Sequence, residues 1–416
     1  MELYQILSIL ILLAASFGYI NARFIKLPTA IGLMFIAIVF SLVVIGLSYF
    51  DDTLYKAELA LIREIDFEEV VMDYMLSFLL FAGALHTHFH YLRSQRWPIL
   101  LFATLGTLTS TFLVGTAVYF LLGALDLEVN YTLCLLFGAL ISPTDPIAVL
   151  GILKKANVPK KLETKIVGES LFNDGVGVVI FLTLFGIAAK GEESIDPWEI
   201  VHLFGLEVIG GLGLGLLIGW VAFLLMKSID DFSIEILITL AAVMGGTVIA
   251  QKLHVSAPLA MVAAGLVVGN DRARSVAMSD LTERYVDKFW ELLDILLNAI
   301  LFVLIGMEML VLVFDTNYIL AGVICIPVIL LCRYVSLFLP VKLYEKKLDF
   351  VPKTTLIMTW GGLRGGISIA LALSLTADMQ RVMFLILTYI VVAFSILVQG
   401  LTIEKLTKRV LPKEEV

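Results

Sequence analysis

The stretch TWGGLRGG, residues 359–366, puts an arginine and four glycines in the middle of an apolar run centred on Ser368. Glycines weaken a helix and allow another backbone to approach closely. A guanidinium at this depth in a lipid bilayer is costly and needs a partner or a water-filled cavity. The stretch therefore predicts a membrane-spanning helix that is broken at its centre, with Arg364 at the break.

A second break is predicted in the stretch ISPTDP, residues 141–146. Pro143 and Pro146 lack a backbone donor and disfavour helical conformation in the residue before them, so the chain should unwind around Thr144 and Asp145. Carbonyl groups that are freed in this way can bind a cation. The two breaks lie seven expected spans apart, so their helices run in opposite directions, as an inverted-topology repeat requires.

The composition around these breaks is that of a membrane protein. Of the 416 residues, 60% are hydrophobic and 16% are charged, whereas a soluble domain carries about 25% charged residues. Apolar runs long enough to cross the ~30 Å hydrocarbon core as helices recur along the whole chain. The thirteen expected spans are centred on Leu10, Ala37, Leu79, Leu113, Leu140, Val178, Gly213, Leu240, Ala263, Phe302, Leu330, Ser368 and Val392.

The expected fold is an all-α polytopic membrane protein with about 13 transmembrane helices, two of them discontinuous and crossed at the midplane. Residues 1–416 are expected to form a single transmembrane transporter domain, with a short cytoplasmic tail at 403–416. The first span has no basic segment before it, so we expect it to remain as a helix and not to be a cleaved signal peptide.

The loop charges predict the orientation of the chain. Of the 29 Lys and Arg residues, 22 lie in one alternating set of expected loops and five in the other. Because Lys and Arg favour the cytoplasmic side, the N-terminus is expected outside and the C-terminus inside, in a plasma membrane of the bacterial inner-membrane type. The net charge of −8 gives no footprint for nucleic acid.

Five charged residues remain inside the expected spans: Asp145, Glu169, Asp174, Arg333 and Arg364. All but Glu169 lie about 13 to 16 Å from the nearest cytoplasmic lysine, at ~1.5 Å per helical residue. Four charges at one level on four spans indicate a built site. If all five are ionised, their formal sum is −1. One monovalent cation or one proton balances that charge, and alternation between them gives one-for-one exchange.

Three motifs together resemble the NhaP/NHE branch of the sodium/proton antiporters over nearly the whole chain: SPTDP at 142–146, GESLFNDG at 168–175 and GGLRGG at 361–366. The resemblance implies a thirteen-helix, NhaA-like fold, a homodimer, and transport of Na⁺ (or Li⁺) and H⁺ without a cofactor. It also implies elevator-type movement of an ion-binding core, around 98–190 and 317–402, against a dimerisation scaffold that the remaining spans form.

The resemblance further implies the roles of individual residues. The ion-binding and proton-binding set is Asp174, Asp145, Asn173, Ser170 and Thr144, of which all but Asn173 are Na⁺ ligands, Thr144 through its backbone carbonyl. The pairing of Asn173 with Asp174 implies electroneutral exchange. Glu169 and Arg333 are implied to form a structural ion pair, and Arg364 to compensate charge. Ala82 stands where many relatives have a glutamate, which removes a third acid from the site.

Other interpretations of these residues remain open. Asp174 and Asp145 can serve as structural caps of broken helices, Arg333 can extend toward the interface, Arg364 can shield helix ends, and Ser170 can bond a carbonyl one turn back. The cluster of His86, His88 and His90 is expected to be a solvated interfacial segment, with a pH sensor or a metal site as the alternatives.

The alternative functions are a K⁺/H⁺ antiporter and a cation-coupled symporter of the same fold. A passive channel is less well matched, because the broken-helix repeat favours alternating access. An intramembrane aspartyl protease using Asp145 and Asp174 needs only two acids at one depth. The sequence lacks the Tyr-Asp and Gly-x-Gly-Asp pairing of such proteases, so we expect a transporter and not an enzyme.

Overall fold

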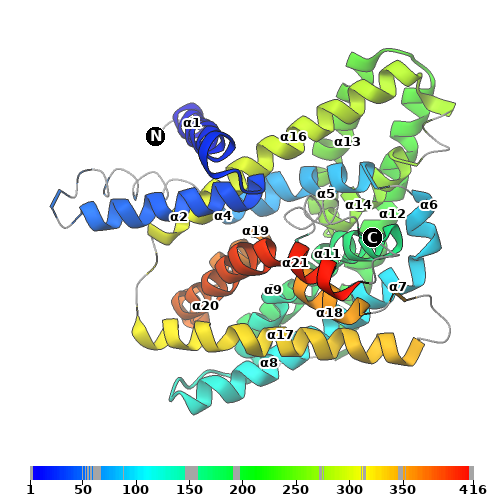
Figure 1. Cartoon of the computed structure of the whole chain (residues 1–416). Helices are drawn as coiled ribbons and strands as arrows, with labels where there is room; N and C mark the ends of the chain where they lie inside the picture. Colours follow the sequence, from blue (N-terminus) through cyan, green and yellow to red (C-terminus); the bar gives the residue numbers. More distant parts are fainter. Residues whose placement is uncertain are drawn as a thin grey trace.

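The computed structural model describes residues 3–48, 50–51, 53, 56, 59, 67–87, 89–145, 158–190, 197–270, 274, 276–310, 312, 315–344, 350–351 and 353–411. Every regular element in these ranges is a helix (Figure 1). The elements are α1 (Leu3–Ile20), η1 (Asn21–Ile25), α2 (Thr29–Leu47), α4 (Phe67–Glu69), η2 (Val70–Met75), α5 (Leu76–Leu85), α6 (Phe89–Ser94), α7 (Arg96–Leu101), η3 (Phe102–Gly106), α8 (Thr107–Ala124), α9 (Tyr131–Ile141), α11 (Lys160–Lys190), α12 (Pro197–Lys227), α13 (Phe232–Lys252), α14 (Ala257–Val268), α16 (Asp280–Met307), η5 (Glu308–Leu310), α17 (Thr316–Tyr344), α18 (Thr354–Gly361), α19 (Gly366–Leu373), η6 (Ala377–Met379), α20 (Arg381–Phe394), η7 (Ser395–Gln399) and α21 (Gly400–Val410).

The helices of the described chain agree with the predicted positions of the spans. Each of the thirteen expected centres lies in one of these helices. Within the described ranges, nine helices are apolar and long enough to cross a membrane, and the bent pair of α18 and α19 makes a tenth. The apolar helices α9 and α14 are shorter, at 11 and 12 residues. The total of thirteen spans therefore stays a prediction.

Polar residues fix the points at which several helices begin. Asn130, Asp231, Ser256 and Ser279 precede α9, α13, α14 and α16, and the side chain of each accepts a backbone N–H of the first turn. The first N–H groups of a helix have no partner within it, so such caps stabilise the start by about 1 kcal/mol each.

The helices pack in two groups. In the first, α9 packs against α8 and α11, and α17 packs against α8 and α20. In the second, α14 packs against α5 and α12, and α16 packs against α2. Figure 1 shows α8, α9, α17 and α20 in the lower half of the view, with α12, α13 and most of α16 above them. The second group has a hydrophobic cluster of its own, in which the rings of Trp290 and Phe81 lie 4.7 Å apart.

Both predicted breaks are present in the described residues. The chain leaves α18 at Gly361 and resumes as α19 at Gly366, and the two helices are bent by 54°. At the other break, α9 ends at Ile141 and residues 142–145 are not helical. Residues 146–157, with Pro146 and the lysine used to estimate the depth of Asp145, lie outside the described residues. The inverted repeat and the second half of this broken helix therefore stay predictions.

The depth estimate for Asp174 assumes that Lys165 lies at the water surface. In the structure Lys165 is not exposed to solvent. Its side chain is fully buried, and its ammonium lies 4.7 Å from the centroid of the Phe350 ring. A cation over the face of an aromatic ring is attracted by the negative charge of that face, which helps to hold the lysine inside. Lys165 is therefore not a solvent-exposed marker from which the depth of Asp174 can be counted.

Candidate functional site

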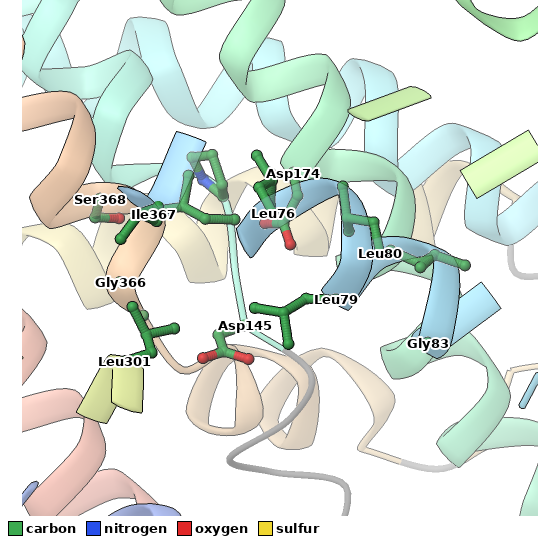
Figure 2. A pocket seen from close by; sticks show the side chains of 14 residues that line it. Leu76, Leu79, Leu80, Gly83, Asp145, Asp174, Leu301, Gly366, Ile367 and Ser368 are labelled. Atoms are coloured by element: carbon green, nitrogen blue, oxygen red, sulfur yellow. The ribbon is translucent and has the colours of Figure 1, made fainter. Parts of the chain in front are cut away.

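Asp174 lies near the middle of α11 and is only 3% exposed. Together with Asp145 it lines a cavity of about 50 Å³. Figure 2 shows the two carboxylates on opposite sides of this cavity, with Leu79 beside the space between them. A single water molecule needs about 10–15 Å³ by this kind of measure. The cavity therefore has room for a small ion or a few water molecules.

The two breaks contact each other at this cavity. The backbone N–H of Asp145 donates to the carbonyl oxygen of Leu363, 2.8 Å away. Gly365 lies directly against the Asp145 carboxylate, so that a β-carbon at this position would collide with it. The glycine that interrupts one helix therefore makes room for the acidic side chain of the other, as the close approach of two backbones requires.

Arg364 closes the open backbone at the proline break. Its Nη1 donates to the carbonyl oxygens of Ser142 and Pro143, at 2.9 and 3.0 Å. Its own backbone N–H donates to Ser395 Oγ at 3.0 Å. Unpaired carbonyls are costly in an apolar interior, and a guanidinium has several donors with which to satisfy them. The carbonyls of Ser142 and Pro143 therefore serve Arg364, and the carbonyl of Thr144 stays the predicted cation ligand.

Asn173 joins α11 to the unwound segment. Its Nδ2 donates to Thr144 Oγ1 at 3.0 Å, and its Oδ1 accepts the Thr144 N–H at 3.3 Å. The hydroxyl of Thr144 also lies 2.9 Å from the hydroxyl of Ser170. All three side chains are buried. These contacts fix the unwound segment at the level of Asp174, because Asn173 and Asp174 are neighbours in the chain.

Glu169 and Arg333, which the resemblance makes partners, are joined by an ion pair. Arg333 Nη2 lies 2.9 Å from Glu169 Oε1, with side-chain exposures of 4% and 2%. No described group donates an aligned hydrogen bond to this oxygen, so the contact at this atom is electrostatic. The guanidinium also packs on Gly362, where a β-carbon would collide with it. Arg333 thus stays inside the helix bundle and does not extend toward the interface.

These groups form one electrostatic network. The charged neighbours of Asp174 are Asp145 and Arg364. The charged neighbours of Arg364 are Asp174, Glu169 and Arg333. The structure therefore brings together all five charges that the sequence places inside the spans.

The part of the cavity wall that η2, α5 and α16 form is apolar in the described residues. The residues that η2, α5 and α16 contribute are Val71, Leu76, Leu79, Leu80, Gly83 and Leu301. Among the described residues, the polar side chains that line the cavity come instead from the unwound segment, α11 and α19, and are Asp145, Asp174 and Ser368. Ala82 is buried but does not line the cavity.

Sequence reasoning missed two serines of the site. Ser368 lines the cavity, and its position two residues after the Gly361–Gly366 break is a signal that could have identified it. Ser395, which accepts the Arg364 N–H, lies in an ordinary apolar run that gives no such signal. In the histidine cluster, His86 contacts the backbone oxygens of Ala82 and Asp287, and His88 lies outside the described residues.

Comparison with known proteins gives matches over nearly the whole chain. The family model described as sodium/hydrogen exchanger, transmembrane, matches residues 11–409. The Na(+)/H(+) antiporter NhaP of Pseudomonas aeruginosa is 50% identical over 397 residues, which cover 94% of this chain and 93% of that protein. The Na(+)/H(+) antiporter NhaH of Halobacillus dabanensis is 35% identical over 410 residues, which cover 97% of each chain.

A solved structure has the same fold. The sodium proton antiporter MjNhaP1 from Methanocaldococcus jannaschii matches with a TM-score of 0.75 and 19% sequence identity, over 99% of this chain and 100% of that one. The family match and the two close relatives together establish that this multi-pass membrane protein belongs to the transmembrane sodium/hydrogen exchanger family of antiporters.

Proposed function

We propose that this protein exchanges Na⁺ (or Li⁺) for H⁺, one for one, and that Asp174 binds the two ions in turn. The observation that carries the proposal is the buried cavity that Asp174 and Asp145 share beside Arg364. Two carboxylates and one guanidinium leave this cavity one positive charge short, because Glu169 and Arg333 neutralise each other. A single monovalent cation or a single proton supplies that charge.

The oxygen atoms around the cavity suit a dehydrated cation. The carboxylates of Asp174 and Asp145 line the cavity and provide charged ligands. The hydroxyl of Ser170 and the backbone carbonyl of Thr144, which lie behind its lining, complete the proposed set. Asn173 holds the Thr144 segment in place through its two hydrogen bonds. Broken helices commonly present such backbone oxygens to Na⁺ in secondary transporters. Protonation of Asp174 removes the charge that anchors the cation and releases it.

The proposed movement is that of an ion-binding core, around 98–190 and 317–402, against a scaffold of the remaining helices. Support comes from the two packing groups and from the apolar wall that the second group turns toward the cavity. An empty charged site crosses poorly because of its dehydration cost, which couples the two ions. The homodimer and the outside N-terminus belong to the same proposal. The alternating loop charges support the orientation.

The decisive experiment is transport by the purified protein in proteoliposomes with an imposed pH gradient. Addition of Na⁺ or Li⁺, with K⁺ as a third arm, should dissipate the gradient in the wild type and not in Asp174→Asn. Glu128→Gln, a loss of one exposed carboxylate in the segment between α8 and α9, is the matched control and should transport normally. Full transport activity of Asp174→Asn would contradict the proposed mechanism.

The stoichiometry is tested by the same vesicles under different membrane potentials. One-for-one exchange moves no net charge, so its rate should not depend on a potential set by K⁺ and valinomycin. A moved elementary charge would be worth about 2.3 kcal/mol per 100 mV, which is easily detected. Transport driven by the potential alone would contradict the charge balance of the cavity.

A further inference from the structure

Asn298, which is buried, and Asp294, which is half-buried, form a polar pair on α16, outside the site described above. Asn298 Nδ2 donates to the carboxylate Oδ1 of Asp294 at 3.0 Å and to its backbone oxygen at 2.8 Å. Asn298 is only 6% exposed, and its Oδ1 accepts no hydrogen bond from the described part of the chain. Buried polar oxygens are normally satisfied by a protein group, a water or an ion. The open oxygen therefore indicates a place for water or a cation.

The pair lies on the face of α16 that leads to the Asp174 cavity. Leu301, which lines the cavity, follows Asn298 by three residues and Asp294 by seven, so all three share one helical face. Trp290, one turn before Asp294 on the same face, packs against Phe81 of α5. The distance from Asp294 to Leu301 along the helix is about 10 Å. The polar pair thus lies between the N-terminal end of α16 and the cavity.

The end of α5 near Asp294 also carries a polar side chain, that of His86. Gly83 lines the cavity, and His86 follows it by three residues. The His86 ring contacts the backbone oxygen of Asp287, and it is an electrostatic neighbour of Asp294. Polar groups of α5 and α16 therefore lead toward a cavity whose own wall on these two helices is apolar.

Two basic residues at this end of α16, Arg274 and Lys288, pair with other acids. Arg274 Nη2 lies 2.6 Å from Asp287 Oδ1, and its Nη1 lies 3.2 Å from Glu283. Lys288 pairs with Glu291 at 2.9 Å. Among the described residues no ion pair involves Asp294. Its carboxylate is therefore able to attract a cation from the side on which these basic residues lie, which the loop charges make the cytoplasmic side.

We propose that Asp294 and Asn298 form an access site for the transported monovalent cation on the cytoplasmic side of the Asp174 cavity. The Asp294 carboxylate attracts the hydrated ion, and the open Asn298 Oδ1 replaces one of its waters before the ion reaches Asp145 and Asp174. This inference rests on the proposed function, because it needs Asp174 as the destination of the ion. It predicts that the pair sets how readily the cation arrives and not how fast a bound cation crosses.

The test measures the apparent KM for Na⁺ in everted membrane vesicles from a host that lacks its own Na⁺/H⁺ antiporters. Asp294→Asn and Asn298→Leu should raise this KM several-fold, since local charge concentrates ions near a site, and should keep the maximal rate. Glu291→Gln is the matched control, a charge loss on the same helix at an exposed position, and should leave the KM unchanged.

Two outcomes overturn the access site. One is a KM in Asp294→Asn and Asn298→Leu that equals that of Glu291→Gln. The other is a KM that rises equally when Na⁺ is presented from the opposite face in right-side-out vesicles, which would place the effect in the shared cavity. If Asn298→Leu fails to accumulate in the membrane, the comparison of Asp294→Asn with Glu291→Gln decides.

Asp174→Asn in the same vesicles separates the two proposals. Transport by Asp174→Asn would contradict both the proposed function and the access site. An inactive Asp174→Asn, together with an unchanged KM in Asp294→Asn and Asn298→Leu, would contradict the access site but not the proposed function.

Discussion

The guanidinium of Arg364 donates to the carbonyl oxygen of Ser142 at 2.9 Å, across a separation of 222 residues. A charged side chain at one helix break therefore satisfies the backbone of the other break. Pro143 contributes a second carbonyl to the same nitrogen. The two interrupted helices depend on each other for the hydrogen bonds that each lacks.

Arg364→Gln is expected to abolish transport, because it removes a positive charge beside Asp174 and opens two carbonyls. Arg364→Lys keeps the charge but lacks the planar fork. Each charge-assisted hydrogen bond contributes about 1.5–3 kcal/mol, so the lysine variant should transport at least roughly tenfold more slowly. Transport rate and thermal unfolding of the purified protein measure the two effects. A lysine variant with the wild-type transport rate and stability would show that the positive charge at position 364 is sufficient and that the shape of the guanidinium is not required.

Glu169 and Arg333 should behave as a buried pair in a double-mutant cycle. Arg333→Met or Glu169→Met alone leaves an uncompensated buried charge, which typically destabilises by about 3–5 kcal/mol. The double variant removes both charges and should be more stable than either single variant. Thermal unfolding in detergent measures all four proteins. Additive losses of stability would mean that the two residues act separately.

Gly365→Ala should disturb Asp145 directly. A β-carbon at Gly365 would collide with the carboxylate, whereas one at Gly213 of α12 would meet no atom within 4 Å. We expect Gly365→Ala to raise the KM for Na⁺ and to lower the rate, and Gly213→Ala to do neither. Uptake of radioactive Na⁺ into proteoliposomes provides the comparison. Equal KM values for the two variants would show that Asp145 does not take part in cation binding.

Asn173→Asp should make the exchange sensitive to membrane potential. The aspartate still accepts the Thr144 N–H but adds one negative charge, so the cavity then needs two positive charges for balance. Transport under potentials of opposite sign, set with K⁺ and valinomycin, measures this effect. Voltage-independent exchange at the wild-type rate would contradict the charge balance. Asn173→Ala is the companion variant, which loses both hydrogen bonds to Thr144 without adding charge.

The local chemistry of the sequence predicts the two breaks and the buried charges. Pro143 and the glycines at 361–366 weaken helices wherever they stand, so the interruptions follow without knowledge of the packing. Buried charges are rare enough in apolar spans to mark a site on their own. The thirteen span centres follow from hydropathy in the same way, and all lie in helices of the described chain.

Contacts between distant segments could not be predicted in this way. Nothing near Ser395 in the sequence indicates that its hydroxyl accepts the Arg364 N–H. Lys165 resembles any lysine at a membrane surface, because the Phe350 ring that covers it lies far along the chain. The hydrogen bond between Asn298 and Asp294 lies within α16, but its position near His86 of α5 is known only from the packing of the two helices. Such features depend on which helix faces which.

The leucines that face Asp174 from α5 and α16 have one further consequence. Dispersion contacts between apolar surfaces have no preferred direction, unlike hydrogen bonds, so one surface can slip past the other without any bond having to find a new partner. The cargo and all its proposed ligands lie on one side of that smooth boundary. A displacement along this boundary would therefore carry the ion together with its whole coordination shell, and no ligand would have to be exchanged on the way.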